Sequence, residues 1–539
     1  MDIRQEIKEK IKEALNKCDI SDVEIELERP QDMSHGDYST NVALVAGGNP
    51  KELALKIVEN IDIEGVSIAG PGFINFKLPK DYFIDYLRGI DDSFGNNSIN
   101  KGKRILIEYT DPNPFKQFHI GHLMSNAIGE SVSRILEASG AEVKRGNYFG
   151  DVGPHVARTI WGMMNSSDMP DEGSSLERKT EFLGNSYVYG SEMYEKDPEI
   201  KTQIEEINIH IYKKDSEEIN SLYEKGRRWS LEHFEEIYKK LGTSFDYYFP
   251  ESEVFEKGSL IVKENLGKVF EESEGAIVFR GEDYGLHTRV FITSKGTPTY
   301  DAKEIGLQHK KIETYPYDES ITITANEQAD FMKVAWKAYE ELGGDKSRLK
   351  HISHGMMRLS SGKMSSRKGN IITGEDLLEE VEKLARGKAD DVSLSEKVAV
   401  GAIKYSILKQ SPSKDIVFDF DKSLSFEGDS GPYLQYTLAR INSVIEKAET
   451  TSEMKDYSEN AEVLVKLITR FPEVIERSVS EYSPHYIATY LIELSSSFNA
   501  FYAKEKISDD SNNLAITKVV RIILSKGLHL LAIPTPEKM

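Results

Sequence analysis

The sequence has one cysteine, Cys18, among its 539 residues, so no disulfide can form within the chain. An oxidising compartment is therefore neither required nor suggested. The sequence also has no run of about 18 uncharged apolar residues, the length that a membrane-spanning helix needs. Its first residues alternate charged and apolar side chains instead of forming the apolar core of a signal peptide. We expect a cytoplasmic protein with no membrane partner.

Basic residues are in deficit, with 68 Lys and Arg against 90 Asp and Glu and a net charge of −22. Nonspecific affinity for nucleic acids comes from Lys and Arg that neutralise phosphates, so this balance argues against a general nucleic-acid coat. Any RNA contact must use local patches. One segment, residues 358–368, has no acid and carries Arg358, Lys363, Arg367 and Lys368. Such a run is usually a solvated surface, so its meaning depends on the motif around it.

The length and the 39% hydrophobic content predict about three or four domains. Residues 1–95 read as a small α+β domain. It would contain a helix over 2–17, a half-buried strand over 23–27, a helix from Asn49-Pro50 and a strand over 66–78. The polar linker at 91–97 closes it.

Residues 96–424 are predicted to form an α/β domain of the Rossmann type. A short apolar strand at 104–109 leads through a proline-rich loop into a helix over 121–139, with Gly140 as its C-terminal cap. Further strands are expected at 276–279, 290–293 and 321–324, the last in the parallel sheet, and a helical insertion over 170–245. From 425 to 539 the apolar spacing is helical, which predicts a separate all-helical domain.

The proline-rich loop ends in His119-Ile120-Gly121-His122, where the predicted helix begins. Imidazole and backbone N–H groups at a helix N-terminus can face phosphates, and the helix dipole favours negative charge there. Gly121 has no side chain, so an adenine ring could approach the backbone. The alternative is a pair of capping histidines with no ligand. The position between a strand and a helix favours the nucleotide site.

A second motif, Lys363 to Asn370, follows some 240 residues later. It resembles the KMSKS loop of class I aminoacyl-tRNA synthetases, a basic loop that closes on the pyrophosphate of ATP. Ser366 stands where that pattern has its second lysine. Alone, the segment would be an exposed basic turn, but the two motifs occur together and in the order of the class I enzymes.

The whole chain resembles one family within that class, the arginyl-tRNA synthetases. The resemblance rests on residues 36–41 and 71–75 near the start and on 431–441, 498–502 and 534–539 near the end, a combination that other class I synthetases lack. It implies a tRNA-contacting domain at 1–95, a catalytic domain at 96–424 and an anticodon-binding domain at 425–539. It also implies ATP-dependent activation of L-arginine and its transfer to the 3′ end of tRNA-Arg. We expect a monomer that uses ATP with Mg²⁺ as substrate, without a tightly bound cofactor or a metal site.

The resemblance also assigns roles to single residues. The catalytic set is Lys116, His119, His122, Lys363 and Lys368. The ATP-binding set is His119, Gly121, His122, His354, Met356 and Lys363. The arginine-binding set is Glu108, Asn113, Glu251, Tyr300, Glu304 and Gln328, with Glu251 and Glu304 at the guanidinium. The tRNA-reading set is Tyr433, Tyr436, Arg440, Tyr502 and Met539.

Four assignments leave alternatives open. Glu304 stands where the family commonly has aspartate, and it could instead be a surface glutamate paired with a lysine of its own helix. Asp111 stands where serine is more usual, and it could act on the substrate amine or cap the loop. Either Lys116 or Lys368 could replace the missing loop lysine. His155 could serve the catalytic region or only the fold.

Two other functions compete with the ligase. An adenylate-forming nucleotidyltransferase would share the HIGH core but would need no anticodon domain, whereas this chain has a helical segment after the core. A synthetase-like RNA-binding or regulatory protein would have degenerate motifs, whereas both motifs stand in this sequence.

Overall fold

The computed structural model describes residues 3–30, 35–360, 373–387 and 391–539. Its contacts divide the chain into two compact units. The first contains residues 1–93, 444–470 and 497–520, and the second contains residues 94–443, 471–496 and 521–539. Each unit is described by itself.

The first unit contains the predicted N-terminal α+β module. The helix α1 (Ile3–Lys17) buries Ile7, Ile11 and Leu15, as the apolar spacing predicts. The predicted strand at 23–27 is wrong. Among the described residues, this segment makes a single bridge, from Glu28 to Ser39 of β1 (Tyr38–Thr40), and β1 is only three residues long. The antiparallel sheet has the order β1-β3-β2. Its elements are β1 (Tyr38–Thr40), α2 (Val42–Val45), α3 (Pro50–Asn60), β2 (Val66–Ala69), β3 (Phe73–Phe76) and α4 (Lys80–Arg88).

The single strand expected over 66–78 is instead a hairpin of β2 and β3. Gly70 and Gly72 stand between the two strands with φ of +57° and +141°. Glycine reaches such angles without a steric penalty, so the chain reverses there and the apolar run pairs with itself.

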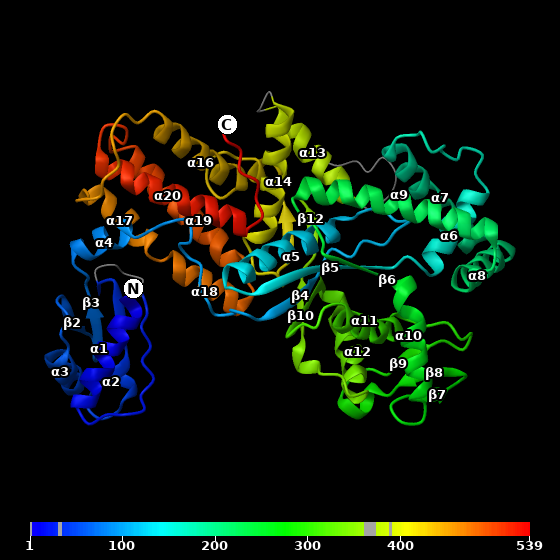
Figure 1. Cartoon of the computed structure of the whole chain (residues 1–539), viewed down its shortest axis with the longest axis horizontal. Helices are drawn as coiled ribbons and strands as arrows, with labels where there is room; N and C mark the ends of the chain where they lie inside the picture. The colour runs from blue at the N-terminus through cyan, green and yellow to red at the C-terminus, as the bar shows by residue number, and fades with distance from the viewer. Residues whose placement is uncertain (1–2, 31–34, 361–372, 388–390) are drawn as a thin grey trace. The chain divides into compact units, whose positions relative to one another are not determined.

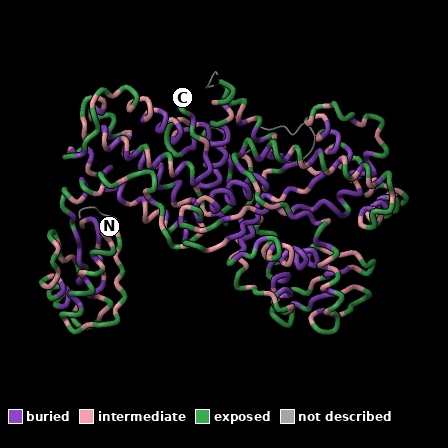
Figure 2. The backbone as a smooth tube through the Cα atoms, in the orientation of Figure 1, coloured by how far each residue is buried: buried purple, intermediate pink, exposed green. Residues whose placement is uncertain are grey.

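The second unit is built on a parallel sheet of five strands in the order β11-β10-β4-β5-β6 (Figure 1). All four pairings are parallel, and Glu108 at the end of β4 aligns with Gly146 of β5 and Thr322 of β10. The central strands β4 and β10 are buried along most of their length (Figure 2). This confirms the predicted fold class. The strands are β4 (Arg104–Glu108), β5 (Glu142–Phe149), β6 (Tyr247–Pro250), β10 (Glu319–Ala325) and β11 (Leu349–His354).

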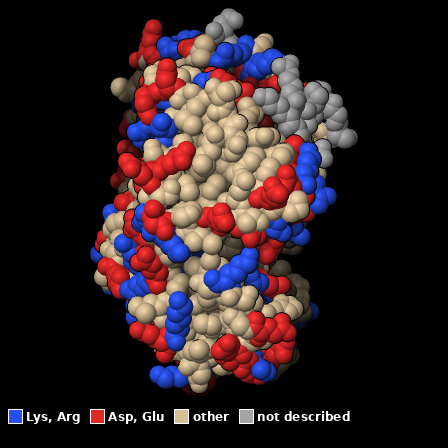
Figure 3. Space-filling view, turned by 90° about the vertical axis from the view of Figure 1, so that its right-hand side faces the viewer, with Lys and Arg blue, Asp and Glu red and all other residues tan. Residues whose placement is uncertain are grey.

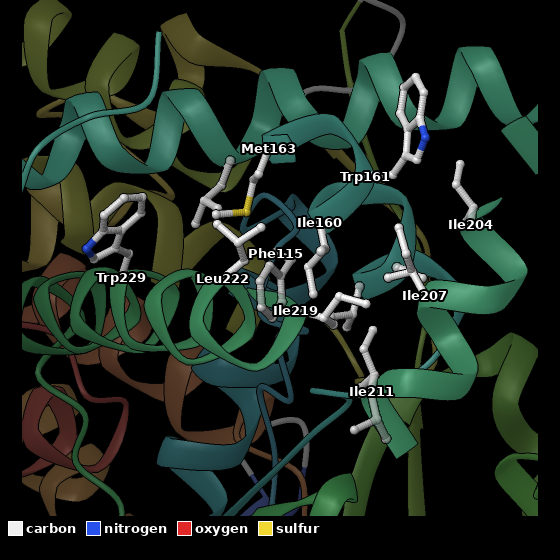
Figure 4. Packing of buried hydrophobic residues seen from close by; sticks show 14 of the residues in the cluster. Phe115, Ile160, Trp161, Met163, Ile204, Ile207, Ile211, Ile219, Leu222 and Trp229 are labelled. Atoms are coloured by element: carbon white, nitrogen blue, oxygen red, sulfur yellow. The ribbon is translucent and has the colours of Figure 1, made fainter. Parts of the chain in front are cut away.

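The predicted strand, loop and helix at the start of the sheet are present. The helix α5 (Ile120–Ala138) follows β4 and the proline-rich loop, and Gly140 has a φ of +88° just after it. Between β5 and β6 the expected helical insertion appears as α6 to α9. A buried cluster that includes Phe115, Ile160 and Trp229 holds these helices together (Figure 4). The helices are α6 (Pro154–Met164), α7 (Leu176–Lys196), α8 (Pro198–Lys213) and α9 (Glu217–Leu241).

The strands expected at 276–279 and 290–293 lie outside the parallel sheet. They belong to an antiparallel sheet, β7-β8-β9, which packs with α10, α11 and α12 around Phe270, Phe279 and Phe291. The elements are α10 (Glu251–Glu264), β7 (Glu271–Ser273), β8 (Ala276–Phe279), β9 (Arg289–Ile292), α11 (Tyr300–Thr314) and α12 (Ala329–Glu341).

The rest of the chain is mainly helical, as predicted from residue 425 onward. A short parallel pair, β12 with β13, precedes it. Leu434, Leu438 and Ile441 are buried on one helix, and Leu494 and Phe498 on another. The elements are β12 (Met357–Leu359), α13 (Gly374–Arg386), α14 (Val392–Leu408), β13 (Ile416–Phe418), α15 (Phe420–Ser423), α16 (Gly431–Glu446), α17 (Glu459–Ile468), α18 (Phe471–Glu481), α19 (His485–Tyr502) and α20 (Ser511–Leu530).

The surface agrees with the acidic composition. On the face drawn in Figure 3, Lys and Arg side chains are interspersed with Asp and Glu side chains and do not merge into one basic surface. Among the residues that the structure describes, no helix has the length and apolarity that crossing a bilayer requires.

Candidate active site

A cavity of about 350 Å³ opens at the carboxyl ends of the parallel strands. Every strand of the sheet contributes to it: Glu108 ends β4, Tyr148 lies near the end of β5, Glu251 follows β6, Ala325 ends β10 and His354 ends β11. Ligands of open α/β sheets bind in this crevice because the loops that leave the strands converge there.

The cavity brings together two sets of residues that the sequence assigned to different ligands. All six predicted arginine-binding residues line it: Glu108, Asn113, Glu251, Tyr300, Glu304 and Gln328. Four of the predicted ATP-binding residues line it too: His119, Gly121, His122 and His354. The two sets therefore share one space, although they lie up to 246 positions apart in the chain, from Glu108 to His354.

The loop between β4 and α5 has a strained backbone. Thr110 and Asp111 have φ of +79° and +52°, a region that side chains rarely adopt and that a β-branched threonine adopts least. Thr110 is tied down by its N–H, which donates to Ser125 Oγ at 2.9 Å, and by Asn126 Nδ2, which donates to Thr110 Oγ1 at 3.0 Å. Ser125 in turn donates to the Ile323 carbonyl. These buried bonds hold the loop against the sheet.

Two side chains of the same loop continue the hydrogen bonding of β5 beyond the end of β4. The Tyr148 N–H donates to Asp111 Oδ1 at 2.9 Å, and the Gly150 N–H donates to Asn113 Oδ1 at 2.8 Å. A Cβ at position 150 would lie 2.6 Å from Asn113 Oδ1 and 3.2 Å from Glu251 Oε1, so this site needs glycine. The loop, β5 and the start of α10 are thereby placed together around the cavity.

The HIGH motif forms the N-terminus of α5. His119 is the N-cap residue, its N–H donates to His122 Nδ1 at 3.1 Å, and the two rings stack with centroids 3.5 Å apart. A Cβ at Gly121 would lie 3.0 Å from two atoms of the His119 ring, so glycine makes room for that ring. The capping alternative is thus correct in part. It leaves the cavity position of both histidines unchanged.

The electrostatics of the two histidines favour neutral rings. Burial lowers the pKa of His119 to about 4, with a further contribution from Lys116, and burial lowers the pKa of His122 well below its ordinary value. Because His122 Nδ1 accepts the backbone N–H, a neutral His122 carries its proton on Nε2. That N–H is a donor for a ligand.

Two carboxylates of the cavity are already paired with buried lysines. Lys311 Nζ lies 2.8 Å from Glu108 Oε2, and Lys303 Nζ lies 2.6 Å from Glu251 Oε2. The hydroxyl of Tyr148 also donates to Glu251 Oε1, at 3.1 Å. Burial raises the pKa of both Glu108 and Glu251, while the lysines oppose that shift. Each pair is close to neutral as a unit.

Glu304 is held differently. Its Oε1 accepts from Gln308 Nε2 at 2.7 Å and from Trp336 Nε1 at 2.8 Å, and the residue is only 3% exposed. The alternative of a surface glutamate paired with a lysine is therefore wrong. The second oxygen, Oε2, is left for a ligand.

Several residues of the predicted site lie elsewhere. Lys116 lines a neighbouring cavity of about 470 Å³ between α7, α9 and α13, with its ammonium 5.6 Å from the Tyr187 ring. Met356 is 48% exposed and does not line the cavity at the strand ends. Lys363 and Lys368 lie outside the described residues.

His155 is buried beside the site but does not line it. Its Nε2 is 2.9 Å from the Gly150 carbonyl, and burial lowers its pKa to about 3. A neutral ring that donates from Nε2 fixes the turn at Gly150, which supports the structural alternative for this histidine.

The sequence reasoning missed the residues that position the acids. Lys303 and Lys311 are buried, and Asp151 accepts from both the N–H and the hydroxyl of Ser252, next to Glu251. Asp151 also pairs with Arg227 of α9, at 2.9 Å. A usable signal was the run of polar residues at 304, 308 and 311, which is the spacing of a buried helix face.

The predicted tRNA readers are partly exposed. On α16, Tyr433, Tyr436 and Arg440 are half-buried, and the Arg440 guanidinium lies 4.8 Å from the Tyr436 ring centroid. Tyr502 is 38% exposed and stacks on Phe498. Met539 is half-buried at the end of the terminal segment.

Comparisons with known proteins identify the family of the chain. Residues 90–420 match the family model for class I tRNA synthetases (R), catalytic domain. Residues 434–539 match the DALR anticodon binding domain, and residues 5–78 match the arginyl tRNA synthetase N terminal domain.

Whole-chain relatives give the same family. The arginine–tRNA ligase of Treponema denticola is 31% identical over 97% of this chain and 96% of its own length. That of Borrelia garinii subsp. bavariensis is 32% identical over 88% of this chain and 87% of its own. Among solved structures, Thermus thermophilus arginyl-tRNA synthetase has a TM-score of 0.79 at 24% identity and covers 99% of this chain and all of its own, which supports the fold. The chain belongs to the class I arginyl-tRNA synthetases.

Proposed function

We propose that this enzyme joins L-arginine to the 3′ end of tRNA-Arg at the expense of ATP. The observation that carries the proposal is the shared cavity, in which the HIGH histidines and six acidic, amide and aromatic residues surround one space. An amino acid and a nucleotide must meet in such a space for the carboxylate to reach the phosphate.

Class I synthetases use ATP. In the first step that we propose, the arginine carboxylate attacks the α-phosphorus, pyrophosphate leaves, and arginyl-adenylate forms. His119 and His122 donate N–H groups to the phosphates from the N-terminus of α5, whose dipole favours the developing negative charge. Lys116, Lys363 and Lys368 supply cations. We assign Mg²⁺ to the phosphates of ATP, because magnesium is usually held by phosphate oxygens and water with few protein ligands. Among the described residues no cluster of His, Cys, Asp or Glu is arranged to hold a metal.

The guanidinium is assigned to the acidic end of the cavity. A planar cation with five N–H donors binds best to carboxylates and other acceptors in its plane. Glu304 offers Oε2, and its other oxygen is locked by Gln308 and Trp336, so its orientation is set before the substrate arrives. Glu251, which is paired with Lys303, is the second carboxylate that we assign to the guanidinium. Tyr300 lines the site at the start of α11.

In the second step the terminal ribose hydroxyl of the tRNA attacks the carbonyl carbon of the adenylate, and AMP leaves. We propose that unpaired bases of the tRNA anticodon stack on Tyr433, Tyr436 and Tyr502. Arg440 and Met539 are proposed to contact the anticodon as well. We also propose that the enzyme is a cytoplasmic monomer. Its functional domains would be residues 1–95, 96–424 and 425–539.

Pyrophosphate exchange with each of the twenty amino acids, with and without tRNA, tests the proposal. We expect exchange with arginine alone. Exchange with another amino acid would overturn the substrate, and adenylation followed by release of an amide or thioester without tRNA would favour the nucleotidyltransferase. Absence of any adenylation, with retained tRNA binding, would favour an RNA-binding protein.

A further inference from the structure

Five acids of the described chain line the cavity, of which Glu327 is exposed. The other four divide into two kinds. Glu108 and Glu251 each have a buried lysine within ion-pair distance. Glu304 and Asp111 have none among the described residues, and both line the cavity. Two carboxyl groups without a cationic partner therefore face a space proposed for arginine, a substrate with two cationic groups.

The contact that Asp111 makes with the backbone does not require a charge. Its Oδ1 accepts the Tyr148 N–H at 2.9 Å, just as Asn113 Oδ1 accepts the Gly150 N–H two residues further on. Asn113 accepts its backbone N–H with a neutral amide oxygen. A carboxylate at position 111 adds a charge that is costly to bury unless a partner arrives.

The second carboxyl oxygen of Asp111, Oδ2, makes no hydrogen bond to the described residues, while Oδ1 is fixed by Tyr148. The strained φ of +52° at Asp111 and the anchored Thr110 before it hold the side chain at this place on the cavity wall. Asn113, assigned to the amino-acid end of arginine, stands two residues away on the same loop.

We propose that Asp111 binds the α-ammonium group of the substrate, while Glu304 takes the guanidinium. This rests on the proposed arginine activation and adds a specificity residue to it. The two unpaired acids then match the two cations of one ligand, and the third charge of arginine, its carboxylate, is directed toward the phosphates.

The environment of Asp111 makes this contact dependent on pH. Glu108 on β4 and Glu304 on α11 oppose its charge, whereas Lys311 on α11 and the Tyr148 N–H on β5 favour it. Tyr238 on α9 also lies close enough to interact with it. Burial, followed by Glu108, raises the pKa of Asp111 well above its ordinary value. Below that raised pKa the carboxyl is protonated, so the KM for arginine should fall as pH rises through it.

The experiment compares arginine with 5-guanidinopentanoic acid, which is arginine without its α-amino group. The KM for arginine and the inhibition constant of the analogue are measured by pyrophosphate exchange in the wild type, Asp111→Asn and Asp111→Ser. Asparagine keeps the acceptor for Tyr148 and removes only the charge. Asp246→Asn is the matched control. Asp246 Oδ2 accepts the backbone N–H of Arg145 at 2.9 Å, on the strand β5 that also contains Tyr148, and Asp246 lies outside the cavity.

We expect Asp111→Asn to raise the KM for arginine about 30-fold or more, since one partner of a desolvated ion pair is lost. The inhibition constant of the analogue should stay nearly unchanged, and Asp246→Asn should alter neither. The pH dependence of the KM should flatten in Asp111→Asn and Asp111→Ser. An equal rise for arginine and the analogue, or no rise for arginine, would overturn the inference. Lack of arginine exchange in the wild type would instead overturn the proposed function.

Discussion

Lys303 Nζ lies 2.6 Å from Glu251 Oε2, with both side chains almost completely removed from solvent. The lysine stands one residue before Glu304, the acid of α11 proposed for the guanidinium, and it pairs with a second acid of the same cavity. The strand-end acid Glu108 is neutralised in the same way by Lys311, eight residues later on α11. The fold thus provides lysines for Glu108 and Glu251, whereas Glu304 and Asp111 have no such partner among the described residues.

We predict that breaking this pair destabilises the enzyme. In Lys303→Met, Glu251 would be left buried without its cation, which costs about 3–5 kcal/mol. The melting temperature should fall, and the double variant Lys303→Met/Glu251→Gln should recover most of it, as followed by calorimetry. Lys144→Met removes the exposed partner of Asp246 and should have little effect. A double variant as unstable as Lys303→Met would show that the two residues do not act as a pair.

Citrulline, the neutral analogue of arginine, should be a poor substrate. Its ureido group leaves Glu304 without a charged partner, so the wild type should prefer arginine by about 10⁴-fold in kcat/KM. Glu304→Gln should raise the KM for arginine and shrink this preference, because the amide can still accept from Gln308 and Trp336 but carries no charge. Glu313→Gln, an exposed position of the same helix, serves as control. Equal use of citrulline and arginine by the wild type would contradict the pocket.

Lys116 should carry the charge that the loop lacks at Ser366. A preorganised cation at a developing charge is worth roughly 3–4 kcal/mol, so Lys116→Ala should slow arginine-dependent pyrophosphate exchange by about 10²–10³-fold. Binding of tRNA should change little, and Ser366→Lys should restore part of the rate. Gln117→Ala, the exposed neighbour, is the control. Near-normal turnover of Lys116→Ala with loss in Lys368→Ala would place the compensating charge in the loop.

The terminal residues should matter for tRNA alone. Gln435 Nε2 donates to the Pro534 carbonyl at 2.7 Å, so the segment is anchored before its last residues. Deletion of Lys538 and Met539 should leave that anchor intact and raise the KM for tRNA while the KM for ATP stays constant. Aminoacylation kinetics measure both. An unchanged KM for tRNA would mean that the end of the chain is only frayed.

The buried histidines should make the fold sensitive to acid. His155 has its pKa lowered to about 3, whereas an unfolded histidine titrates near 6.5, so below that pH the unfolded state binds the extra proton. Its contribution should lower the unfolding free energy by about 2 kcal/mol between pH 7.5 and pH 5. His155→Gln should therefore lose less melting temperature than the wild type over this interval. The exposed His287→Gln is the control, and an equal loss in His155→Gln would refute the assignment.

Patterns of short range were readable from the sequence. The strand before the HIGH motif, the helix after it and the glycine cap at 140 depend on neighbours in the chain, and all three are present. The strand at 23–27 was not predictable, because a strand exists only if a partner of matching length lies beside it, and β1 ends after three residues. The hairpin at 66–76 was missed because the two glycines that reverse the chain were read as part of one apolar run.

Motif spacing and the resemblance that it carries were enough to place this chain in a family and to name six of the residues that line the cavity. The charge state of that cavity was not in the sequence. In the sequence, Lys303, Lys311 and Asp111 cannot be distinguished from other charged residues. Only the fold brings residues that are distant in the chain within a few ångströms of them. An ion pair depends on distance and burial, not on position in the chain, so only the tertiary structure decided which acids of the cavity have a lysine partner and which do not.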